Sequence, residues 1–317
     1  MAVYGQMRNE TVTILMATYN GSAYIENQIL SLQQQKYKDW VLYIRDDGSS
    51  DNTVEIIKSL QSNDHRIHLV EDEIKGLGPG RNFLSIVKYS RSDYTIYCDQ
   101  DDIWLENKIS EMVKYSDECG VNISNQPSIV YADGYAFFDE TGEIDFTGIS
   151  HNHAKDLAGF LFFNGGYQGC SIMFNQAMVK FLSDYKGMIY LHDDITSLAA
   201  HAFGEVHFLP KKLMLYRQHS KAVTGMKKFN DGRFSKLTSG VNYLLSRKHF
   251  NVKESFFELY GEELKPKNKD VFNKYIKFCH SKSRILQLKF LIEGRFTLND
   301  SAIKLFIKFI LRRKFDS

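Results

Sequence analysis

The sequence lacks the features that mark disulfide-bonded or membrane-spanning proteins. Only four of its 317 residues are cysteines and no two are spaced as CxxC, so a disulfide framework is not expected. No segment approaches the roughly 20 consecutive apolar residues of a spanning helix. The N-terminus does not read as a signal peptide, and no internal repeat or low-complexity tract is present. We therefore expect a cytoplasmic protein with reduced thiols.

The composition is typical of a packed soluble protein, but its charge is unevenly distributed. Of the 317 residues, 43% are hydrophobic and 14% aromatic, which allows one large domain or one with a smaller partner. Residues 1–226 hold 19 lysines and arginines against 29 acidic residues, whereas the chain from Lys227 onward holds 21 against 9. We expect an acidic domain over residues 1–225 and a basic, helical C-terminal extension over residues 226–317.

The first hundred residues alternate between strand-like and helix-like segments. Strands are expected at Thr11–Ala17, Trp40–Arg45, Ile67–Val70 and Tyr94–Cys98, with helices at Ile25–Gln34, Thr53–Leu60 and Arg81–Ser90. Strands and helices that alternate with short loops favour a parallel, doubly wound α/β sheet. The carboxyl ends of such strands meet at one edge, where open α/β sheets bind their ligands.

An acidic cluster follows the strand Tyr94–Cys98. Asp99, Asp101 and Asp102 fall within four residues, and carboxylates this close repel one another unless a cation neutralises them. Mg²⁺ or Mn²⁺ suits such oxygen ligands and often shares them with substrate phosphates. The alternative is a solvated acidic turn that caps the next helix. Because Thr18–Asn20 and Asp46–Asp51 end two further strands, one nucleotide-sized site would explain all three loops together.

The second half of the chain has a less regular pattern. Strands are expected at Ile129–Phe138 and separately at Val206–Leu209 and Leu213–Tyr216, and Gly165–Asn175 is expected to be a turn that enters a strand. His192, Asp193 and Asp194 precede a helical run, Ile195–Phe203.

Five short motifs occur in the order found in one enzyme family. They are Ala17–Gly21 (ATYNG), Asp46–Ser49 (DDGS), Asp99–Asp102 with Trp104 (DQDDxW), His192-Asp193 (HD) and Tyr216–His219 (YRQH). Over residues 11–225 the set resembles the family-2 glycosyltransferases, which are inverting enzymes of the GT-A fold. The resemblance implies a doubly wound mixed sheet, with a Rossmann-like nucleotide-binding half, an acceptor half and a C-terminal helical extension. The HD and YRQH motifs look most like the rhamnosyltransferase branch of surface polysaccharide synthesis.

The resemblance also implies roles for individual side chains around the leaving diphosphate. Asp101 is expected to bind Mn²⁺ or Mg²⁺, with Asp99 and Gln100 at the donor and Asp102 in support. His219 resembles a late histidine that reaches the metal or the diphosphate, and a neutral imidazole suits either. A metal on the leaving diphosphate would neutralise the charge that develops there.

A second group of residues is expected to hold the nucleoside. By resemblance Asp47 accepts the N3–H of a uracil or thymine ring with Asp46 beside it, while Thr18 and Tyr19 frame the base. Arg81 would donate to the diphosphate. The acceptor hydroxyl needs a base opposite the leaving group, for which we choose Asp193, with Asp194 as the alternative.

Several of these residues also have purely structural interpretations. Asp46 and Asp47 could be turn residues and N-caps of the helix near Thr53, and Arg81 could lie on a helix surface. Trp104 could belong to the core or form a platform for a sugar. Cys170 has no basic neighbour in sequence and is expected to be a small buried residue.

The reaction, donor and acceptor remain open to more than one interpretation. Transfer from dTDP-L-rhamnose or a UDP-hexose such as UDP-galactose or UDP-glucose to a saccharide hydroxyl, on a lipid-linked acceptor, is the leading interpretation. A sugar-1-phosphate nucleotidyltransferase is disfavoured because no glycine-rich phosphate loop follows the first strand. A non-catalytic nucleotide-binding subunit is disfavoured because every expected carboxylate is present.

The basic tail suggests an anionic partner. Ile303–Phe315 (IKLFIKFILRRKF) has helical spacing that places Leu305, Phe306, Phe309 and Ile310 on one face, flanked by lysines and arginines. Such a helix suits an anionic membrane, so we expect peripheral attachment at the inner face of the cell membrane and no nucleic-acid partner. The alternative is a helix that packs on the catalytic domain.

Overall fold

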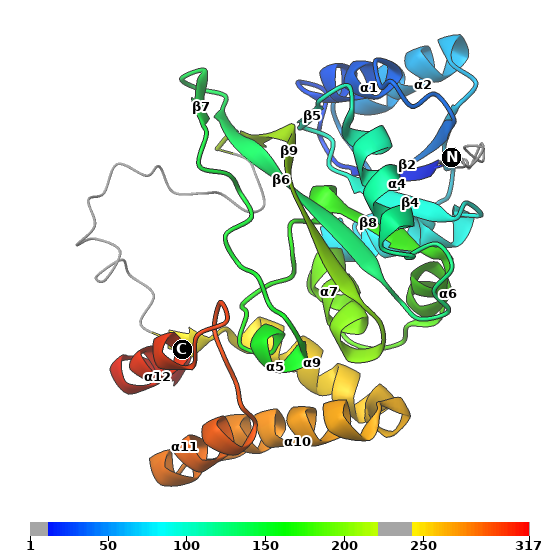
Figure 1. Cartoon of the computed structure of the whole chain (residues 1–317). Coiled ribbons are helices and arrows are strands. Elements are labelled where there is room, and N and C mark those ends of the chain that lie inside the picture. Colours follow the sequence, from blue (N-terminus) through cyan, green and yellow to red (C-terminus); the bar gives the residue numbers. More distant parts are fainter. Residues whose placement is uncertain (1–11, 221–242, 317) are drawn as a thin grey trace, which may run out of the picture.

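The computed structural model describes residues 12–220 and 243–316. Its first part alternates strands and helices along the chain (Figure 1). The elements are β1 (Val12–Thr18), α1 (Ile25–Gln33), β2 (Trp40–Asp46), α2 (Thr53–Asn63), β3 (Ile67–Leu69), α3 (Gly78–Ile86), a 3-10 turn (Val87–Tyr89) and β4 (Tyr94–Cys98). The expected alternation is therefore confirmed.

The first four strands are parallel and in close register. Val12 pairs with Trp40 on one side and with Tyr94 on the other, in the order β3-β2-β1-β4. The same register sets Thr18 at the end of β1 beside Asp46 at the end of β2. The polar loops that follow these strands consequently lie at one edge of the sheet.

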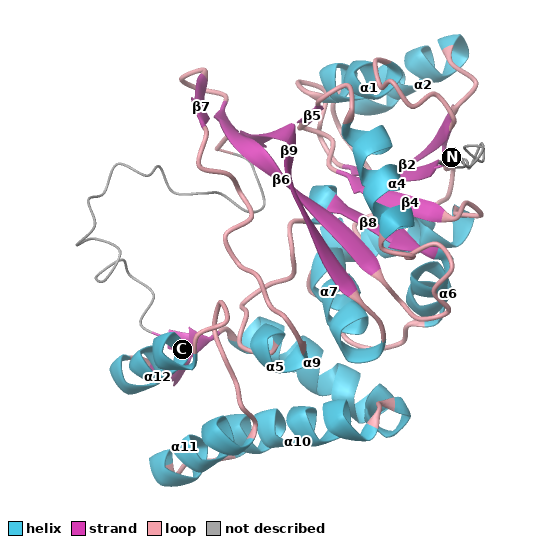
Figure 2. Ribbon diagram, viewed as in Figure 1, coloured by secondary structure: helices cyan, strands magenta, loops and turns pink. Residues whose placement is uncertain are grey.

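The later strands turn the sheet into a mixed one. They are β5 (Ile103–Trp104), β6 (Ile129–Phe138), β7 (Glu143–Asp145), β8 (Ile172–Asn175, after the 3-10 turn Gly169–Ser171) and β9 (Val206–Gln218). The order is β3-β2-β1-β4-β8-β6-β9-β5, with β8 antiparallel to both neighbours and β7 paired with β6. Figure 2 shows β6 and β9 as two long twisted strands in the middle of the molecule.

The expectation of two separate strands at 206–209 and 213–216 is wrong. The structure has one strand of 13 residues, β9, whose pairing with β6 shifts register near Pro210. Leu209 pairs with Ala132, and the next pair joins Lys212 to Asp133. Proline cannot donate a ladder hydrogen bond, so the pattern breaks locally while the strand continues. The continuation carries Arg217 and Gln218 to the acidic edge.

Helices cover both faces of the sheet, and side chains alternate between two cores. Ile14 and Met16 of β1 face α1, α2 and α4 (Lys108–Glu118). Leu15 faces the other core, which contains α3, the short α5 (Leu157–Phe160), α6 (Gln176–Asp184) and α7 (His192–Phe203). This two-sided burial explains why the central strands read as nearly continuous apolar runs.

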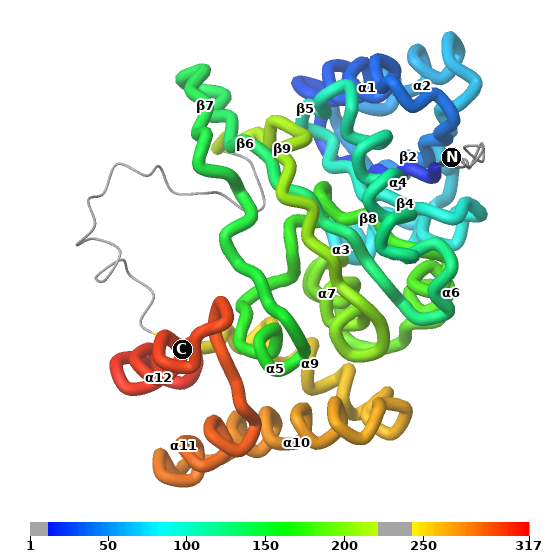
Figure 3. Tube along the Cα trace, in the orientation of Figure 1, coloured from blue at the N-terminus to red at the C-terminus, as the bar shows by residue number. Residues whose placement is uncertain are grey.

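The described part of the C-terminal extension packs on the α7 side. Its elements are β10 (Tyr243–Leu245), α9 (Arg247–Tyr260), the 3-10 turn Gly261–Glu263, α10 (Pro266–His280), α11 (Arg284–Glu293), α12 (Ala302–Leu311) and β11 (Arg313–Phe315), which pairs with β10. Figure 3 shows α9 and α10 below α7, with α9 level with α5. Phe256, Phe272 and Tyr275 share one hydrophobic cluster with Phe160. The expected boundary between residues 225 and 226 lies outside the described residues.

The apolar face of helix α12 is only partly covered by the rest of the protein. Leu305 and Phe309 are buried, at 2% and 5% exposure, whereas Phe306 and Ile310 are exposed. The four residues share one broad face of the helix, as expected, but only half of that face is covered by the protein. They occupy i and i+4 positions on two neighbouring stripes of the helix, and only one stripe meets the core.

Candidate active site

The loop after β2 is folded around the Asp46 carboxylate. Its Oδ1 accepts the backbone N–H groups of Gly48 and Ser49 at 2.9 and 2.7 Å, and its Oδ2 accepts the Thr18 and Ser49 hydroxyls. Thr18 is 1% exposed. The structure thus gives Asp46 the turn-forming role considered above, with Thr18 holding it from the neighbouring strand. Their expected contact with a nucleotide stays a prediction.

Asp47 connects the ends of β2 and α3. Its two oxygens accept the backbone N–H groups of Leu77 and Gly78 at 2.9 and 2.8 Å, where α3 begins. The favourable dipole of a helix N-terminus suits this carboxylate. Arg45, 1% exposed, donates from Nη1 to Asp47 Oδ1 at 3.2 Å. Asp47 therefore does cap a helix, but it caps α3 rather than the helix near Thr53, and its role at a base stays a prediction.

Arg45 is the centre of a buried polar network behind Asp47. It makes two hydrogen bonds of 2.8 Å to Asp72, one of 2.8 Å to Asn82 Oδ1, and one to the Ile74 carbonyl. The Arg45 hydrogen bonds lower the pKa of the Asp72 carboxyl. The local sequence around Arg45 does not predict these contacts, because its partners Asp72 and Asn82 lie 27 and 37 residues away.

Gln100 ties the ends of β1 and β4 together. Its amide accepts the Tyr19 N–H and donates to the Tyr19 carbonyl, both at 3.0 Å. The Tyr19 side chain is 58% exposed at the mouth of this edge. Arg81 lies exposed on the first turns of α3. These positions leave Tyr19 and Arg81 accessible to a ligand and give Gln100 a positioning role in the protein itself.

Asp101 and His219 come together from distant parts of the chain. His219 Nε2 lies 2.8 Å from Asp101 Oδ2, and the side chains are 9% and 20% exposed. Arg217 braces the pair by donating from Nε to the Asp101 carbonyl at 2.7 Å and from Nη1 to Asp139. The Tyr24 ring is tilted against the His219 ring, with their centres 4.7 Å apart, and its hydroxyl donates to Asp139. Asp101 and His219 are expected from the sequence, whereas Tyr24 and Asp139 are not.

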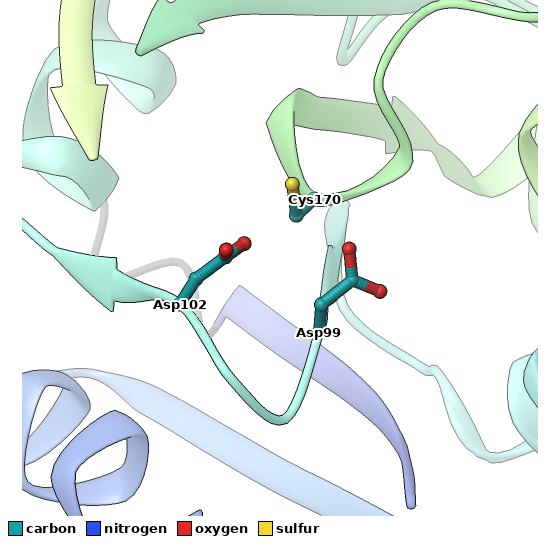
Figure 4. A group of neighbouring side chains, drawn as sticks. All are labelled: Asp99, Asp102 and Cys170. Atoms are coloured by element: carbon teal, nitrogen blue, oxygen red, sulfur yellow. The ribbon is translucent and has the colours of Figure 1, made fainter. Parts of the chain in front are cut away.

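A second carboxylate group lies deeper. Figure 4 shows Asp99, Asp102 and Cys170 converging, and one ligand atom of each lies within 4.8 Å of the others. Burial and the charge of Asp101 raise the pKa of Asp99 to about 7. Lys108 is buried beside them and donates to the Cys170 carbonyl at 2.7 Å. Its ammonium group already supplies positive charge here.

Trp104 and Cys170 have structural roles in this arrangement. Trp104 is 3% exposed, and Lys108 Nζ lies 3.8 Å from its ring centre, so Trp104 belongs to the core. Burial raises the pKa of the fully buried Cys170 thiol well above its usual value, which agrees with a structural thiol.

The first turn of α7 presents Asp193 to the same region. Burial raises the pKa of Asp193 well above its usual value, and the charges of Asp194 and Asp99 raise it further. A carboxylate with a raised pKa is a stronger base near neutral pH. A Cβ on Gly169 would lie 3.5 Å from the Asp193 Cβ, and the next residue, Cys170, belongs to the group with Asp99 and Asp102, so the first turn of α7 adjoins that acidic group.

His192 fixes the position of this turn without hydrogen bonds. Its ring centre lies 3.9 Å from that of Phe83 and 4.5 Å from that of Tyr97. Burial lowers the pKa of His192 to about 3, so the ring is neutral. Neither ring nitrogen has a hydrogen-bond partner within residues 12–220 and 243–316. His192 is an aromatic packing residue in this structure.

The residues present fit a divalent cation at Asp101 and His219 better than in the deeper group. A carboxylate oxygen and an imidazole nitrogen already lie side by side there, and both are ligands that Mn²⁺ accepts. The deeper group combines a thiol with two carboxylates beside a lysine, which is a poor set for Mg²⁺ or Mn²⁺.

Comparisons with known proteins relate the chain to glycosyltransferases. The family model described as glycosyl transferase family 2 matches residues 13–179. The dTDP-rhamnosyl transferase RfbG of Shigella flexneri is 30% identical over 224 residues, which span 66% of this chain and 73% of RfbG. The UDP-Glc:alpha-D-GlcNAc-diphosphoundecaprenol beta-1,3-glucosyltransferase WfgD of Escherichia coli is 37% identical over 108 residues, 34% of this chain and 41% of WfgD.

A solved structure supports the fold. TarS of S. aureus (residues 1–349, in complex with UDP-GlcNAc) superposes with a TM-score of 0.55 at 15% identity, covering 90% of this chain and 77% of TarS. The expected GT-A fold, a mixed sheet with a helical C-terminal region, is confirmed. Because the family model matches more than half of the chain and RfbG is related over most of its length, the protein belongs to glycosyl transferase family 2.

Proposed function

We propose that this glycosyltransferase is metal-dependent and inverting, and that it transfers L-rhamnose from dTDP-L-rhamnose to a hydroxyl of a lipid-linked saccharide in surface polysaccharide synthesis. A UDP-hexose is the alternative donor. The observation that carries the proposal is the pairing of Asp101 with His219, 2.8 Å apart. Asp99 and Asp102 of the same loop group with Cys170, whose neighbour Gly169 lies against Asp193. The similarity to RfbG supports rhamnose, and the lipid-linked substrate in the name of WfgD supports the acceptor class.

The residues divide the reaction between them. Asp101 and His219 would hold Mn²⁺ or Mg²⁺, which supplies charge stabilisation for the departing diphosphate. Arg217 fixes the backbone of Asp101. Arg81 donates to the diphosphate, and Asp193 takes the proton of the incoming hydroxyl, so that attack from the opposite side inverts the anomeric centre.

Two substitutions separate binding from chemistry. Asp101→Asn should abolish Mn²⁺-dependent binding of dTDP, followed by isothermal titration. Asp193→Asn should leave dTDP binding within twofold and lower hydrolysis of dTDP-L-rhamnose by about 10²- to 10⁴-fold. Asp194→Asn is the matched control for base assignment. Normal turnover by the Asp193 variant would move the base elsewhere.

A thermal-shift panel identifies the donor. Only ligands that bind the native state raise the midpoint. We expect dTDP and dTDP-L-rhamnose with Mn²⁺ to raise it more than UDP, UDP-glucose or UDP-galactose. A larger shift with a UDP-sugar would replace rhamnose by that hexose.

We further propose that α12 rests on an anionic membrane. Ile303, Ile307 and Leu311 are 72%, 48% and 67% exposed, and Lys304 and Arg313 are exposed among them. Apolar side chains flanked by cations are the pattern of interfacial helices. None of the helices within residues 12–220 and 243–316 is both long and apolar enough to cross a bilayer.

Point substitutions test the membrane proposal better than truncation, because truncation would also remove the buried Leu305 and Phe309. The triple variant Ile303→Ser, Ile307→Ser, Leu311→Ser should lose sedimentation with phosphatidylglycerol vesicles while dTDP-L-rhamnose hydrolysis continues. Ile123→Ser, which changes an exposed isoleucine distant from α12 in the sequence, is the control. Equal sedimentation of the triple variant and the wild type would refute this contact.

A further inference from the structure

The C-terminal extension contacts the first turn of α7, where Asp193 lies. His249, on the first turn of α9, lies with its Nδ1 2.8 Å from Asp194 Oδ2. The side chains of His249 and Asp194 are 13% and 6% exposed. An ionised carboxylate can only accept, so His249 donates. The residue beside the proposed base is thus held by a helix outside the family-model match, which ends at residue 179.

The extension reaches the same turn by a second route. Asn164 donates to the Leu244 carbonyl at 3.1 Å and accepts the Ser246 N–H at 2.7 Å. The loop that follows Asn164 packs directly against α7, because a Cβ on Gly166 would lie 2.3 Å from the Asp193 carbonyl oxygen. Residues 244–249 therefore support the first turn of α7 at two places, directly through His249 and indirectly through Asn164 and the loop that follows it.

A small internal pocket surrounds the His249–Asp194 pair. It is lined by Phe160, Gly165, Asp194, Leu198, His249, Val252 and Lys253. Asp194 Oδ1 opens toward this environment with no hydrogen-bond partner in the described parts of the chain. Lys253, 4% exposed, donates to the Leu161 and Phe163 carbonyls. The pair is thus sheltered from water, which strengthens its electrostatic effect on neighbours.

We propose that His249 is a positioning residue for glycosyl transfer: by donating a hydrogen bond to Asp194, it holds the first turn of α7, and with it Asp193, in place and stabilises the Asp194 carboxylate next to the base. The inference rests on the proposed role of Asp193. Without His249, the uncompensated Asp194 carboxylate would repel the neighbouring Asp193 carboxylate. The catalytic turn and the C-terminal extension would then form one functional unit.

The titratable and charged groups around Asp193 define the expected pH effect. Asp194 and neutral His192 lie on α7, His249 and Lys253 on α9, and Asp99 and Tyr97 at the end of β4. Replacing His249 removes its hydrogen bond to Asp194 and leaves all residues of β4 and α7 unchanged.

The test uses the whole 317-residue chain and follows hydrolysis of dTDP-L-rhamnose with Mn²⁺ across pH. His249→Ala should lower kcat about tenfold and leave KM within twofold. The acidic limb of the pH profile, meaning the pH at which kcat falls to half on the acidic side, should rise by half a pH unit or more. His249→Asn keeps an amide N–H near the Nδ1 position and should recover most of kcat. In the double variant His249→Ala, Asp194→Asn the repulsion is gone, so the limb should return to its wild-type position.

Two controls keep the outcomes distinct. His280→Gln removes a histidine–carboxylate pair with Glu254 elsewhere in the extension, where the histidine is 62% exposed, and should change neither kcat nor the limb. Asp193→Asn is measured in parallel: full activity there overturns the proposed base, whatever His249 does. With Asp193→Asn inactive, a folded His249→Ala enzyme with wild-type kcat and limb overturns the positioning role. A loss that tracks only the folded fraction, with the limb unmoved, overturns it equally.

Discussion

Replacing Arg45 should weaken both the fold and the nucleotide site. The guanidinium is 1% exposed and bonds to Asp47, Asp72, Asn82 and the Ile74 carbonyl. Arg45→Met keeps the length of the side chain and removes its charge. Asp47, 6% exposed, would lose its cationic partner, whereas Asp72 is 34% exposed and can be solvated.

The magnitude follows from this asymmetry. Breaking a buried pair by removing one partner costs about 3–5 kcal/mol, and hydration of Asp72 places the expected loss near the lower end, at about 3 kcal/mol. Chemical denaturation of the wild type and the variant measures it. Lys36→Met breaks the Lys36–Glu106 pair, whose side chains are 62% and 63% exposed, and should cost less than about 1 kcal/mol.

The pH dependence has a definite sign. Arg45 lowers the folded-state pKa of Asp72, so its contribution is present above the unfolded pKa near 3.9 and is lost as pH falls through the folded pKa. The stability difference between wild type and Arg45→Met should therefore shrink below about pH 4.

Nucleotide affinity is the functional measure of the same change. Asp47 also fixes the start of α3, from which Arg81 projects. We expect the affinity for dTDP to fall about tenfold, a difference of about 1.4 kcal/mol. A variant as stable as the wild type with unchanged dTDP affinity would refute the reasoning.

Three further substitutions probe the remaining supports of the site. Arg217→Lys cannot reproduce the two guanidinium hydrogen bonds that connect Asp139 with the Asp101 carbonyl. Calorimetry should therefore show Mn²⁺-dependent dTDP binding weakened at least tenfold, and unchanged binding would mean that Arg217 does not position Asp101. Gly169→Ala would place a Cβ 2.5 Å from His192 Nε2, and Phe83 and Tyr97 leave the His192 ring no room to move away. Denaturant titration should therefore show a free energy of unfolding about 1–3 kcal/mol lower than that of the wild type, and an unchanged value would mean that the backbone at Gly169 shifts instead. Burial lowers the folded-state pKa of Lys253 to about 8. As pH rises from about 8 toward the unfolded-state pKa of about 10.4, the wild type should therefore gain stability relative to Lys253→Met, by at most about 3 kcal/mol, and an unchanged difference over this range would show that the pKa of Lys253 is not lowered.

The sequence by itself determined the alternation of strands and helices, the acidic loops at the strand ends and the family. Each depends on local pattern: apolar runs such as Val12–Thr18 are buried on both faces, and polar residues directly after them must turn away from the sheet. The order of the motifs then identified the family without coordinates. The strand at 206–218 was divided wrongly, because local pattern cannot show that a neighbouring strand continues to pair across Pro210.

Only the tertiary structure decided which partners the charged residues have. Asp47 and Asp46 look alike in sequence, yet one caps α3 and pairs with Arg45, while the other closes its own turn. His249 lies 55 residues from Asp194, and no local periodicity predicts their contact. The same holds for α12, whose two apolar stripes are equivalent in sequence until the core covers one. Charge pairing and burial depend on what long-range packing brings together, and a linear pattern carries no record of it.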